Sequence, residues 1–557
     1  MRSDSSLLPS GSSDAETSAP RWRGVSRTRL SGLDAFVLAV ALAILAPLVA
    51  LLFVAGQNGP DDALAHLVAT VLPHYAFTSV LLVLMVGVNV VLLGVGAGWM
   101  VAAYDFPGRR ALQVALILPL AMPAFVLAYA YTDFLDTSGP VQGWLRDVTG
   151  WSIGDYWFPQ VRSLPGAALF LSLALYPYVY MLARNAFAER SLTLAEAARS
   201  LGEPAARVWW RITWPMARPA VVAGVTLVAM ETLADFGTVS FFAVDTFTAG
   251  IYRAWQGLGD RATAARLAVG LLVVVLCLVW MERRQRGRMA FHGRSARPAA
   301  TRRLTGAAAW GATLACATPV VLGFVLPAGL LLRAAWSGQA ELDPRIGAWA
   351  LHTAGLSLLA VLVVVPLALG LAYAVRLTAH PLIRALAGAA GAGYAVPGLV
   401  LGVGLLAVVG GIDRLIHGVW GVGLVLGGTA VAVVYAYCVR FLTVAQQGLD
   451  ASLKRISPSM DASARTLGAG PTEVLRRVHW PLLRPSLATA ALLVFVDCLK
   501  ELPATLVLRP FNYDTLAVVA YQFASDERLA EAAVPSLAIV AVGLLPVVIL
   551  ARSFRRH

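Results

Sequence analysis

The amino-acid sequence predicts an all-α polytopic membrane protein in which about twelve transmembrane helices form two parallel repeats of six. Two observations lead to this prediction. The chain is strongly apolar, with 58% hydrophobic residues, 13% charged residues and a mean hydropathy of +0.72. It also carries an unusually polar segment, EAARSLGEPAARVWWRITWPMARP, that recurs in altered form later in the chain.

The predicted spans are long apolar runs with few charges. About 20 helical residues cross the hydrocarbon core of a bilayer. The runs lack the alternation of polar and apolar residues that is typical of a transmembrane β-barrel, so helices are predicted instead. The expected spans are residues 33–55, 76–103, 111–134, 165–187, 219–243, 266–281, 307–332, 352–375, 385–410, 419–439, 486–508 and 533–551.

The net charge of +13 is distributed as a membrane topology would require. With an even number of spans in each half, most Lys and Arg residues fall on one side, which the positive-inside rule makes cytoplasmic. We therefore expect a multi-pass membrane protein, with both termini cytoplasmic, that contacts membrane lipid and binds no nucleic acid. The basic segments are 1–32, 109–110, 184–218, 283–303, 376–384, 440–484 and 552–556.

The same pattern divides the chain. Residues 1–32 are Ser-rich and then basic, which predicts a disordered cytoplasmic tail. The first transmembrane half is expected at 33–282 and the second at 307–552, joined by a basic cytoplasmic linker at 283–306. The four cysteines lie singly in apolar segments, so neither a disulfide framework nor a thiolate metal site is indicated.

The polar segment, residues 196–219, aligns without a gap on ASARTLGAGPTEVLRRVHWPLLRP, residues 462–485. We call these the first and second repeated loops. Ten of the aligned positions are identical, which indicates an internal duplication. Because six spans separate the two loops, both should emerge on the same side of the membrane, so the halves are parallel repeats. The identical pairs include Ala198/Ala464, Arg199/Arg465, Leu201/Leu467, Gly202/Gly468, Trp214/Trp480 and Pro215/Pro481.

Each repeated loop is predicted to form two short helices. Gly202 and Gly468 should end the first helix in the C′ position, and the second should start near Pro204 or Pro471. We expect Pro215 and Pro481 to close the segment before the fifth span. Two interpretations remain open from these residues: an amphipathic helix that rests on lipid headgroups, or a helix that docks into a groove of a soluble partner.

The EAA sequence, with Gly six residues after its Glu and Pro thirteen residues after that Gly, resembles the coupling motif of importer-type ABC transporter permeases. The resemblance implies the MetI-like permease fold, a location in the plasma (inner) membrane of a bacterium, and two copies of a cytoplasmic ABC ATPase, with a coupling loop in a groove of each. The coupling residues that it implies are Glu196, Ala198, Arg199, Leu201, Gly202, Asp461, Ala464, Arg465, Leu467 and Gly468.

The second copy departs from this motif, because Ala462 aligns with Glu196 and the nearest acid, Asp461, lies one position earlier. A phosphate-binding loop of its own is not expected, since neither of the two lysines, Lys454 and Lys500, fits GxxxxGK[ST]. We therefore predict no catalytic residues and no cofactor bound by this chain, with ATP and Mg on the partner ATPase.

Ionisable residues inside spans are functional-site hypotheses. Glu231 aligns with Asp497 and Asp235 with Glu501, and the spacing of four residues would place each pair on one helix face. These four carboxylates, with Lys500, are the predicted substrate pathway. Carboxylate oxygens suit hard cations, although a transport path should hold no stable metal site. Structural ion pairs, with Lys500 neutralising the acids, are the alternative.

Longer segments are similar to the fused permeases of ferric-iron ABC importers. They are YDFPGRR (104–110), LPLAMPAFVLAYAYTDFLD (118–136), ETLADFGTVSFFAVDTFTAGIYRAW (231–255) and KELPATLVLRPFNYDTLA (500–517). The resemblance implies delivery of Fe(III) by an extracytoplasmic iron-binding protein. Tyr129, Tyr131 and Asp133 could add oxygen groups near the outer face, or belong to an interfacial aromatic belt.

Other substrates, and one other class of transporter, remain as rivals at this point. Thiamine or a polyamine would also suit a carboxylate-lined path, whereas an inorganic anion would sit badly beside four acids. An ion-coupled secondary transporter would use the acids as proton sites, but it would leave the duplicated Gly and Trp-Pro loop unexplained.

Overall fold

The computed structural model describes residues 32–57, 67–188, 197–287, 301–336, 343–378, 380–391, 393–421 and 425–554. Residues 1–31 of the predicted tail, residues 288–300 of the predicted linker, and Glu196 lie outside these ranges.

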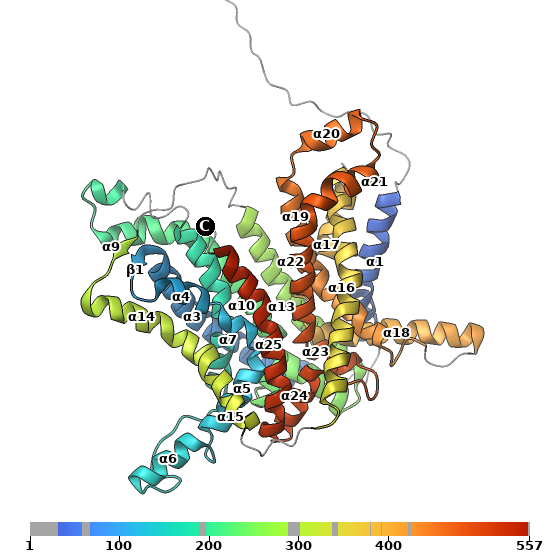
Figure 1. Ribbon diagram of the computed structural model, residues 1–557. Helices are drawn as coiled ribbons and strands as arrows, with labels where there is room; N and C mark the ends of the chain where they lie inside the picture. The colour runs from blue at the N-terminus through green and yellow to red at the C-terminus, as the bar shows by residue number, and fades with distance from the viewer. Residues whose placement is uncertain are drawn as a thin grey trace, which may run out of the picture.

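The first half is almost entirely helical (Figure 1). Its elements are α1 (Gly32–Ala55), η1 (Leu67–Val71), α3 (Leu72–Ala103), β1 (Tyr104–Asp105), α4 (Arg109–Ala115), η2 (Leu118–Ala121), α5 (Ala124–Leu135), α6 (Pro140–Thr149), α7 (Leu164–Ala186), α9 (Ala205–Val208), η4 (Trp209–Thr213), α10 (Trp214–Ala234), α11 (Gly237–Phe241), α12 (Phe247–Tyr252), η5 (Arg253–Gly257) and α13 (Arg261–Gly287).

The second half repeats this order. Its elements are β2 (Arg302–Arg303), α14 (Gly306–Val320), η6 (Val321–Val325), α15 (Leu326–Trp336), α16 (Ile346–Leu377), α17 (Pro381–Ala390), η7 (Gly393–Ala395), α18 (Gly398–Trp420), α19 (Ala430–Arg455), α20 (Pro458–Thr466), α21 (Pro471–Val474), η8 (Leu475–His479), α22 (Trp480–Leu499), α23 (Pro503–Leu508), α24 (Leu516–Ser525) and α25 (Leu529–Phe554).

The predicted all-α membrane architecture is confirmed. Within the described residues, eleven helices are long and apolar enough to cross a membrane, and a bent pair, Arg109–Ala121 with Ala124–Thr149, makes up to twelve. The two strands add one short parallel contact, in which Tyr104 pairs with Arg302 and Asp105 with Arg303. This contact ties the start of the second half to the end of α3.

Five predicted spans need correction. The span at 111–134 bends by 92° between η2 and α5, where Pro123 adopts an extended conformation. The spans at 219–243 and 486–508 break after Ala234 and Leu499. The spans at 385–410 and 419–439 are displaced, since α17 ends at Ala390, α18 runs to Trp420, and α19 begins only at Ala430. The left-handed Gly421 and Gly428 between α18 and α19 account for the last shift.

The hydrophobic cores do not follow the division of the sequence into halves. One core combines α16–α19 and α22 of the second half with α1 and α13 of the first. The other combines α3–α5, α7 and α10 of the first half with α14, α15, α24 and α25 of the second. Each half therefore contributes its first and last spans to the core of the other.

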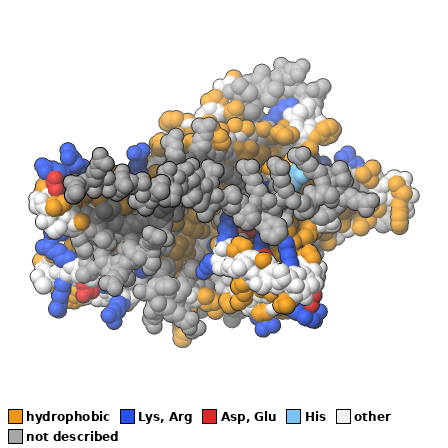
Figure 2. Space-filling view, turned by 90° about the horizontal axis from the view of Figure 1, so that it is seen from above, with side chains coloured by type: hydrophobic (Ala, Val, Ile, Leu, Met, Phe, Trp, Pro, Cys, Tyr) orange, Lys and Arg blue, Asp and Glu red, His pale blue; other side chains and the backbone are white. Residues whose placement is uncertain are grey.

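Both repeated loops lie at the same end of the molecule, the upper end in Figure 1, which we call the loop side. The described chain begins there, since the Thr378 hydroxyl at the end of α16 contacts Asp34 near the start of α1. Its last helix, α25, also ends there. Figure 2, which views this side, shows Lys and Arg side chains along the left and lower edges.

Candidate functional site

The two repeated loops share one helix-ending geometry. Gly202 and Gly468 have left-handed backbones, with φ of 90° and 86°. In each copy the glycine N–H bonds back three residues, to Arg199 or Arg465, and the next N–H bonds back five, to Ala198 or Ala464. This is the Schellman arrangement that satisfies the last carbonyls of a helix, so the predicted C′ role of both glycines is confirmed.

The residues before the glycines point outward. Leu201 is 86% exposed and Leu467 is 88% exposed. Arg199 and Arg465 are also exposed, and Ala198 and Ala464 are half-buried. An exposed leucine at the same place in both copies is an unpartnered apolar group, of the kind that marks a surface for association.

The second helix of each loop continues into a span. α9 follows Pro204 and α21 begins at Pro471, as predicted, but Pro215 and Pro481 do not close the segment. A wider π-helical turn, in which the Trp214 N–H bonds to the Trp209 carbonyl, precedes each proline and carries the helix through. The second helix of each loop therefore forms one continuous helix with the span that follows it, Ala205–Ala234 or Pro471–Leu499. We call each of these continuous helices a rod.

The first rod is held to its neighbours by aromatic rings. The Trp209 ring lies 4.4 Å from Trp99 of α3 and 5.7 Å from Phe187, and Trp99 and Phe187 are 5.2 Å apart. These offset and edge contacts are favourable ring geometries. We call this set the aromatic anchor.

The second loop is held by charge. The Arg376 guanidinium of α16 donates to Asp461 at 2.9 Å and to the carbonyls of Leu453 and Ile456, and His479 lies 2.7 Å from the other Asp461 oxygen. Burial alone would raise the pKa of the Asp461 carboxyl, but the hydrogen bonds from Arg376 and His479 outweigh it and hold the pKa below its usual value. We call Arg376, Asp461 and His479 the ionic anchor. It turns Asp461 inward, toward α16.

The predicted pathway acids do not share helix faces. α10 ends at Ala234, and Asp235, in an extended conformation, accepts the N–H groups of Thr238 and Val239 at 3.1 Å. Glu501 does the same for Ala504 and Thr505 after α22 ends. Both acids therefore cap short helices, α11 and α23, and the prediction of paired faces is wrong. A buried carboxylate is stabilised by such backbone donors, which sequence spacing does not reveal.

Two cations accompany the acids. Lys500 lies 2.9 Å from Asp497, and the largely buried Arg440 of α19 lies 3.3 Å from the buried Glu501. Gly398 leaves room for this pair, since a Cβ there would lie 2.7 Å from both Arg440 and Glu501. Sequence reasoning missed Arg440 because the span was placed at 419–439, which assigned this arginine to a basic loop. The alternative given from the sequence, that the acids form structural ion pairs, therefore applies to Asp497 and Glu501.

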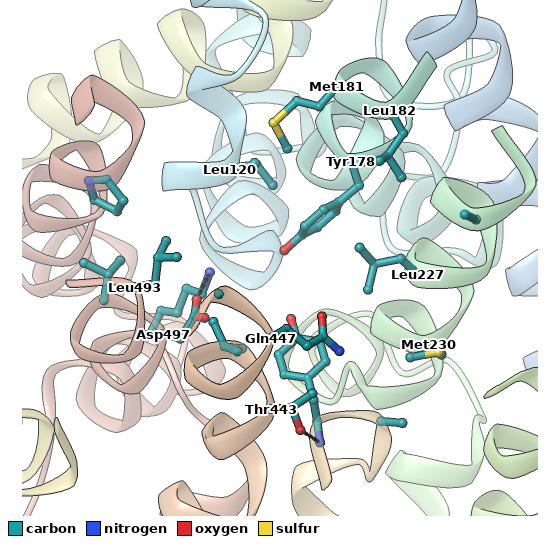
Figure 3. A pocket seen from close by; sticks show the side chains of 18 of the residues that line it. Leu120, Tyr178, Met181, Leu182, Leu227, Met230, Thr443, Gln447, Leu493 and Asp497 are labelled. Atoms are coloured by element: carbon teal, nitrogen blue, oxygen red, sulfur yellow. Dashed lines mark hydrogen bonds and ion pairs between the residues drawn. The ribbon is translucent and has the colours of Figure 1, made fainter. Parts of the chain in front are cut away.

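The pathway residues surround one central space between the halves. Glu231, Asp235, Arg440, Asp497, Lys500 and Glu501 line its narrow part, together with Tyr178 and Tyr394. A cavity of about 620 Å³ extends from Tyr178, Tyr394, Asp497 and Lys500 toward the loop side, past Met181, Gln447 and Val547. In Figure 3 the Tyr178 side chain points into this cavity from one wall and Asp497 lies across from it.

Glu231 differs from the other acids. It has no ion-pair partner within the described part of the chain, and the Tyr394 hydroxyl is close enough to interact with it. Tyr394 in turn interacts with Tyr178 of the other half. One carboxylate and two phenol oxygens thus converge at the centre.

The residues near the opposite face take other roles. Tyr129 and Tyr131 are buried, and their hydroxyls donate to the carbonyls of Ala532 and Leu322 in the second half. They therefore belong neither to an interfacial belt nor to an exposed oxygen site. Asp133 lies at the edge of a cavity shared with Arg162, Arg333 and Glu527.

These features define a class: a duplicated helical membrane protein with a central polar path and two protruding loops on one side is built as a transport permease. Residues 91–283 match the family of binding-protein-dependent transport system inner membrane components. This match lies in the first half of the chain, and with the relatives below it supports a multi-pass inner-membrane permease of the ABC importer type.

Three relatives show how far the likeness extends. The Fe(3+)-transport system permease protein FbpB 2 of Haemophilus influenzae is 25% identical over 93% of this chain and 97% of its own length. The molybdenum permease ModB of Escherichia coli K12 is 28% identical over 35% of this chain and 86% of its own length. The sulfate permease CysW of the same strain is 29% identical over 37% and 67%. These relatives are permeases rather than enzymes, in agreement with the prediction.

Proposed function

We propose that this permease carries ferric iron, delivered by an extracytoplasmic iron-binding protein, and that two copies of a cytoplasmic ATPase drive it. The observation that carries the proposal is the extent of the iron-permease match, which covers both halves in one chain. The molybdenum and sulfate relatives match little more than a third of it.

The central chemistry supports a hard cation through Glu231 rather than through all four acids. Asp235 and Glu501 are engaged by backbone N–H groups, and Asp497 by Lys500. The Glu231 carboxylate with the Tyr178 and Tyr394 hydroxyls is an oxygen donor set, and such donors suit hard cations. No resident metal is needed for transport, because a path must release what it binds.

An oxyanion is the second candidate. Lys500 and Arg440 both line the central space, and with two acids neutralised the earlier argument against an anion loses its force. Molybdenum and sulfate permeases among the relatives favour this candidate independently.

The proposed mechanism is alternating access. The exposed Leu201 and Leu467 enter grooves on the ATPases, and each loop is continuous with the span that ends at the central acids. Movement of the ATPases would therefore move α10 and α22 as rods and rock the two cores. Coupling by residues 196–202 and 461–468 remains a prediction, with Glu196 outside the described residues.

Uptake into vesicles that carry the permease with its partner ATPase and binding protein tests the substrate. We expect accumulation of labelled ferric iron that stops on ATP depletion and survives a protonophore. Accumulation of molybdate, sulfate, thiamine or a polyamine instead would replace the substrate and keep the class. Uptake that stops with the protonophore and survives ATP depletion would contradict ATP coupling.

Docking is tested separately by binding of the purified ATPase. Gly202→Asp with Gly468→Asp should abolish binding, because both loops lose their shape. Leu201→Ser with Leu467→Ser should weaken it while leaving the fold intact. Retained binding in both variants would contradict the coupling role of the loops.

A further inference from the structure

Helix α6 turns its apolar side outward. Its polar residues face the chain: Gln142 donates to the Leu135 carbonyl, and Arg146 donates to the Thr137 carbonyl and to Tyr156. Trp144 and Val148, at helical spacing on the other side, are exposed. We call residues 140–157 the α6 wing. Its exposed apolar side chains are Trp144, Val148, Trp151, Ile153 and Trp157, the last 85% exposed.

The second half has a matching feature. α5 and α18 both follow an extended proline, Pro123 or Pro397, and α18 then continues without a break to Trp420. Asp413 turns inward and accepts three N–H groups from residues 425–427. We call residues 410–420 the α18 wing. Its exposed apolar side chains are Ile412, Leu415, Val419 and Trp420.

The two wings leave the bundle in opposite directions. In Figure 1, α6 projects at the lower left and α18 to the right, crosswise to α16. The α18 wing also protrudes at the right of Figure 2. Neither wing covers the space between the halves, over which a substrate-delivering protein would have to sit.

The α6 wing starts beside a lipid-facing helix. Residues 138–140 share a cavity with Leu330, Arg333 and Ala334 in the last turns of α15. α15 ends at Trp336, which is 91% exposed, and its Leu332 is exposed as well. The apolar outer surface of α15 thus leads directly to the wing.

From these observations we propose that the two wings lie in the membrane–water interface of the leaflet opposite the loop side, with their tryptophans and aliphatic side chains among lipid headgroups and upper acyl chains. Tryptophan favours this depth, and an amphipathic helix lies there with its apolar face toward the acyl chains. The occupant of both surfaces is lipid, and not the binding protein.

The wings are attached to the central path. α5 packs on α11 where Gly237 meets Phe125, and α18 begins at Gly398 against the Arg440–Glu501 pair. Two interfacial attachments on opposite sides of the bundle would hold α5 and α18 at a fixed depth in the membrane while the remainder of each core rocks.

Spin labels test the proposal on the full chain in vesicles of phosphatidylethanolamine and phosphatidylglycerol. In a background in which Cys277, the exposed native cysteine, is serine, labels are placed by Val148→Cys and Leu415→Cys. The matched controls are Asp147→Cys and Arg414→Cys, the adjacent exposed polar positions. Collision with oxygen reports lipid, and collision with a water-soluble nickel complex reports solvent.

We expect the oxygen-to-nickel collision ratio at positions 148 and 415 to exceed that at 147 and 414 without any added protein. Equal ratios at the paired positions would overturn the proposal. A ratio that rises only after the binding protein is added would overturn it in favour of protein docking.

A second measurement avoids labels. Lipids brominated near the headgroup should quench part of the native tryptophan emission, and Trp144→Tyr with Trp157→Tyr should reduce that part, with the remainder coming from tryptophans such as Trp151 and Trp420. Unchanged quenching in this variant would also contradict the α6 wing's position.

Discussion

The two repeated loops have the same backbone but different attachments. Both end their first helix with a left-handed glycine, both expose a leucine, and both continue through a π-helical turn into a span. The first is held by edge and tilted ring contacts around Trp209, whereas the second is held by the Arg376–Asp461–His479 cluster. The duplicated sequence retains what shapes the protruding tip and has changed what fixes it to the bundle.

The largest effect is expected when the ionic anchor is broken. Asp461→Ala leaves the largely buried Arg376 and His479 without their shared carboxylate, at a cost of about 3 kcal/mol. Trypsin should then cleave after Arg465 faster, with cleavage after Arg199 unchanged. The double variant Arg376→Met with Asp461→Leu should recover much of the loss, because apolar side chains can replace such a pair. Equal acceleration in both loops would contradict separate anchors.

Trp209→Ala should loosen the first loop in turn. The indole is partly buried, so we expect a loss of about 2 kcal/mol, below the range for a fully buried ring. Faster cleavage after Arg199 measures it. Trp210→Ala is the matched control: this neighbour is exposed, and its loss should change stability by less than about 0.5 kcal/mol. Similar effects of the two substitutions would show that the aromatic anchor contributes little.

Gly202→Ala and Gly468→Ala should have equal and smaller effects, about 1 kcal/mol each, because a Cβ is strained in a left-handed backbone. Thermal unfolding of the purified protein would detect them. Gly448→Ala is the control, since this glycine lies in α19 with open space around its Cβ position, and alanine there should not destabilise. Unequal losses at 202 and 468 would mean that the two tips are not equivalent.

The smallest expected effect is a difference between the two anchors at low pH. The pKa of Asp461 is below its usual value in the folded chain, so the pair adds stability above the ordinary aspartate pKa of about 3.9 and loses it as the pH falls through the lowered value. Below pH 4 the second loop should become more sensitive to an acid-active protease such as pepsin. The sensitivity of the first loop should not change, because the rings of the aromatic anchor do not titrate. Asp461→Asn should remove this difference.

The sequence was sufficient for features that are set locally. Apolar run length predicted most of the spans, and Gly202 and Gly468 predicted the helix ends, because a left-handed C′ position selects glycine. The duplication placed both loops on one side. Glu231, Asp497 and Lys500 line one central space, as their places near the ends of two equivalent spans suggested.

The misses come from contacts that local spacing does not contain. Asp235 and Glu501 end their helices because each caps the next one. Arg440 was assigned to a loop because an arginine inside a span is unfavourable without a partner. Its partner, Glu501, follows a different span, so the sequence around Arg440 does not reveal it. The ionic anchor likewise needs Arg376 from α16, and the outward apolar face of α6 needs the tertiary contacts of Gln142 and Arg146.

The exchange of first and last spans between the cores has a consequence for assembly. Because α1 and α13 complete the core built around α16, and α14 with α25 completes the core built around α3, neither half has a finished interior by itself. The exchanged spans hold the two halves together through their shared cores. The covalent link near residue 300 therefore serves mainly to ensure that one copy of each half is made. A chain cut there and produced as two pieces would still have to meet its partner before either piece could fold.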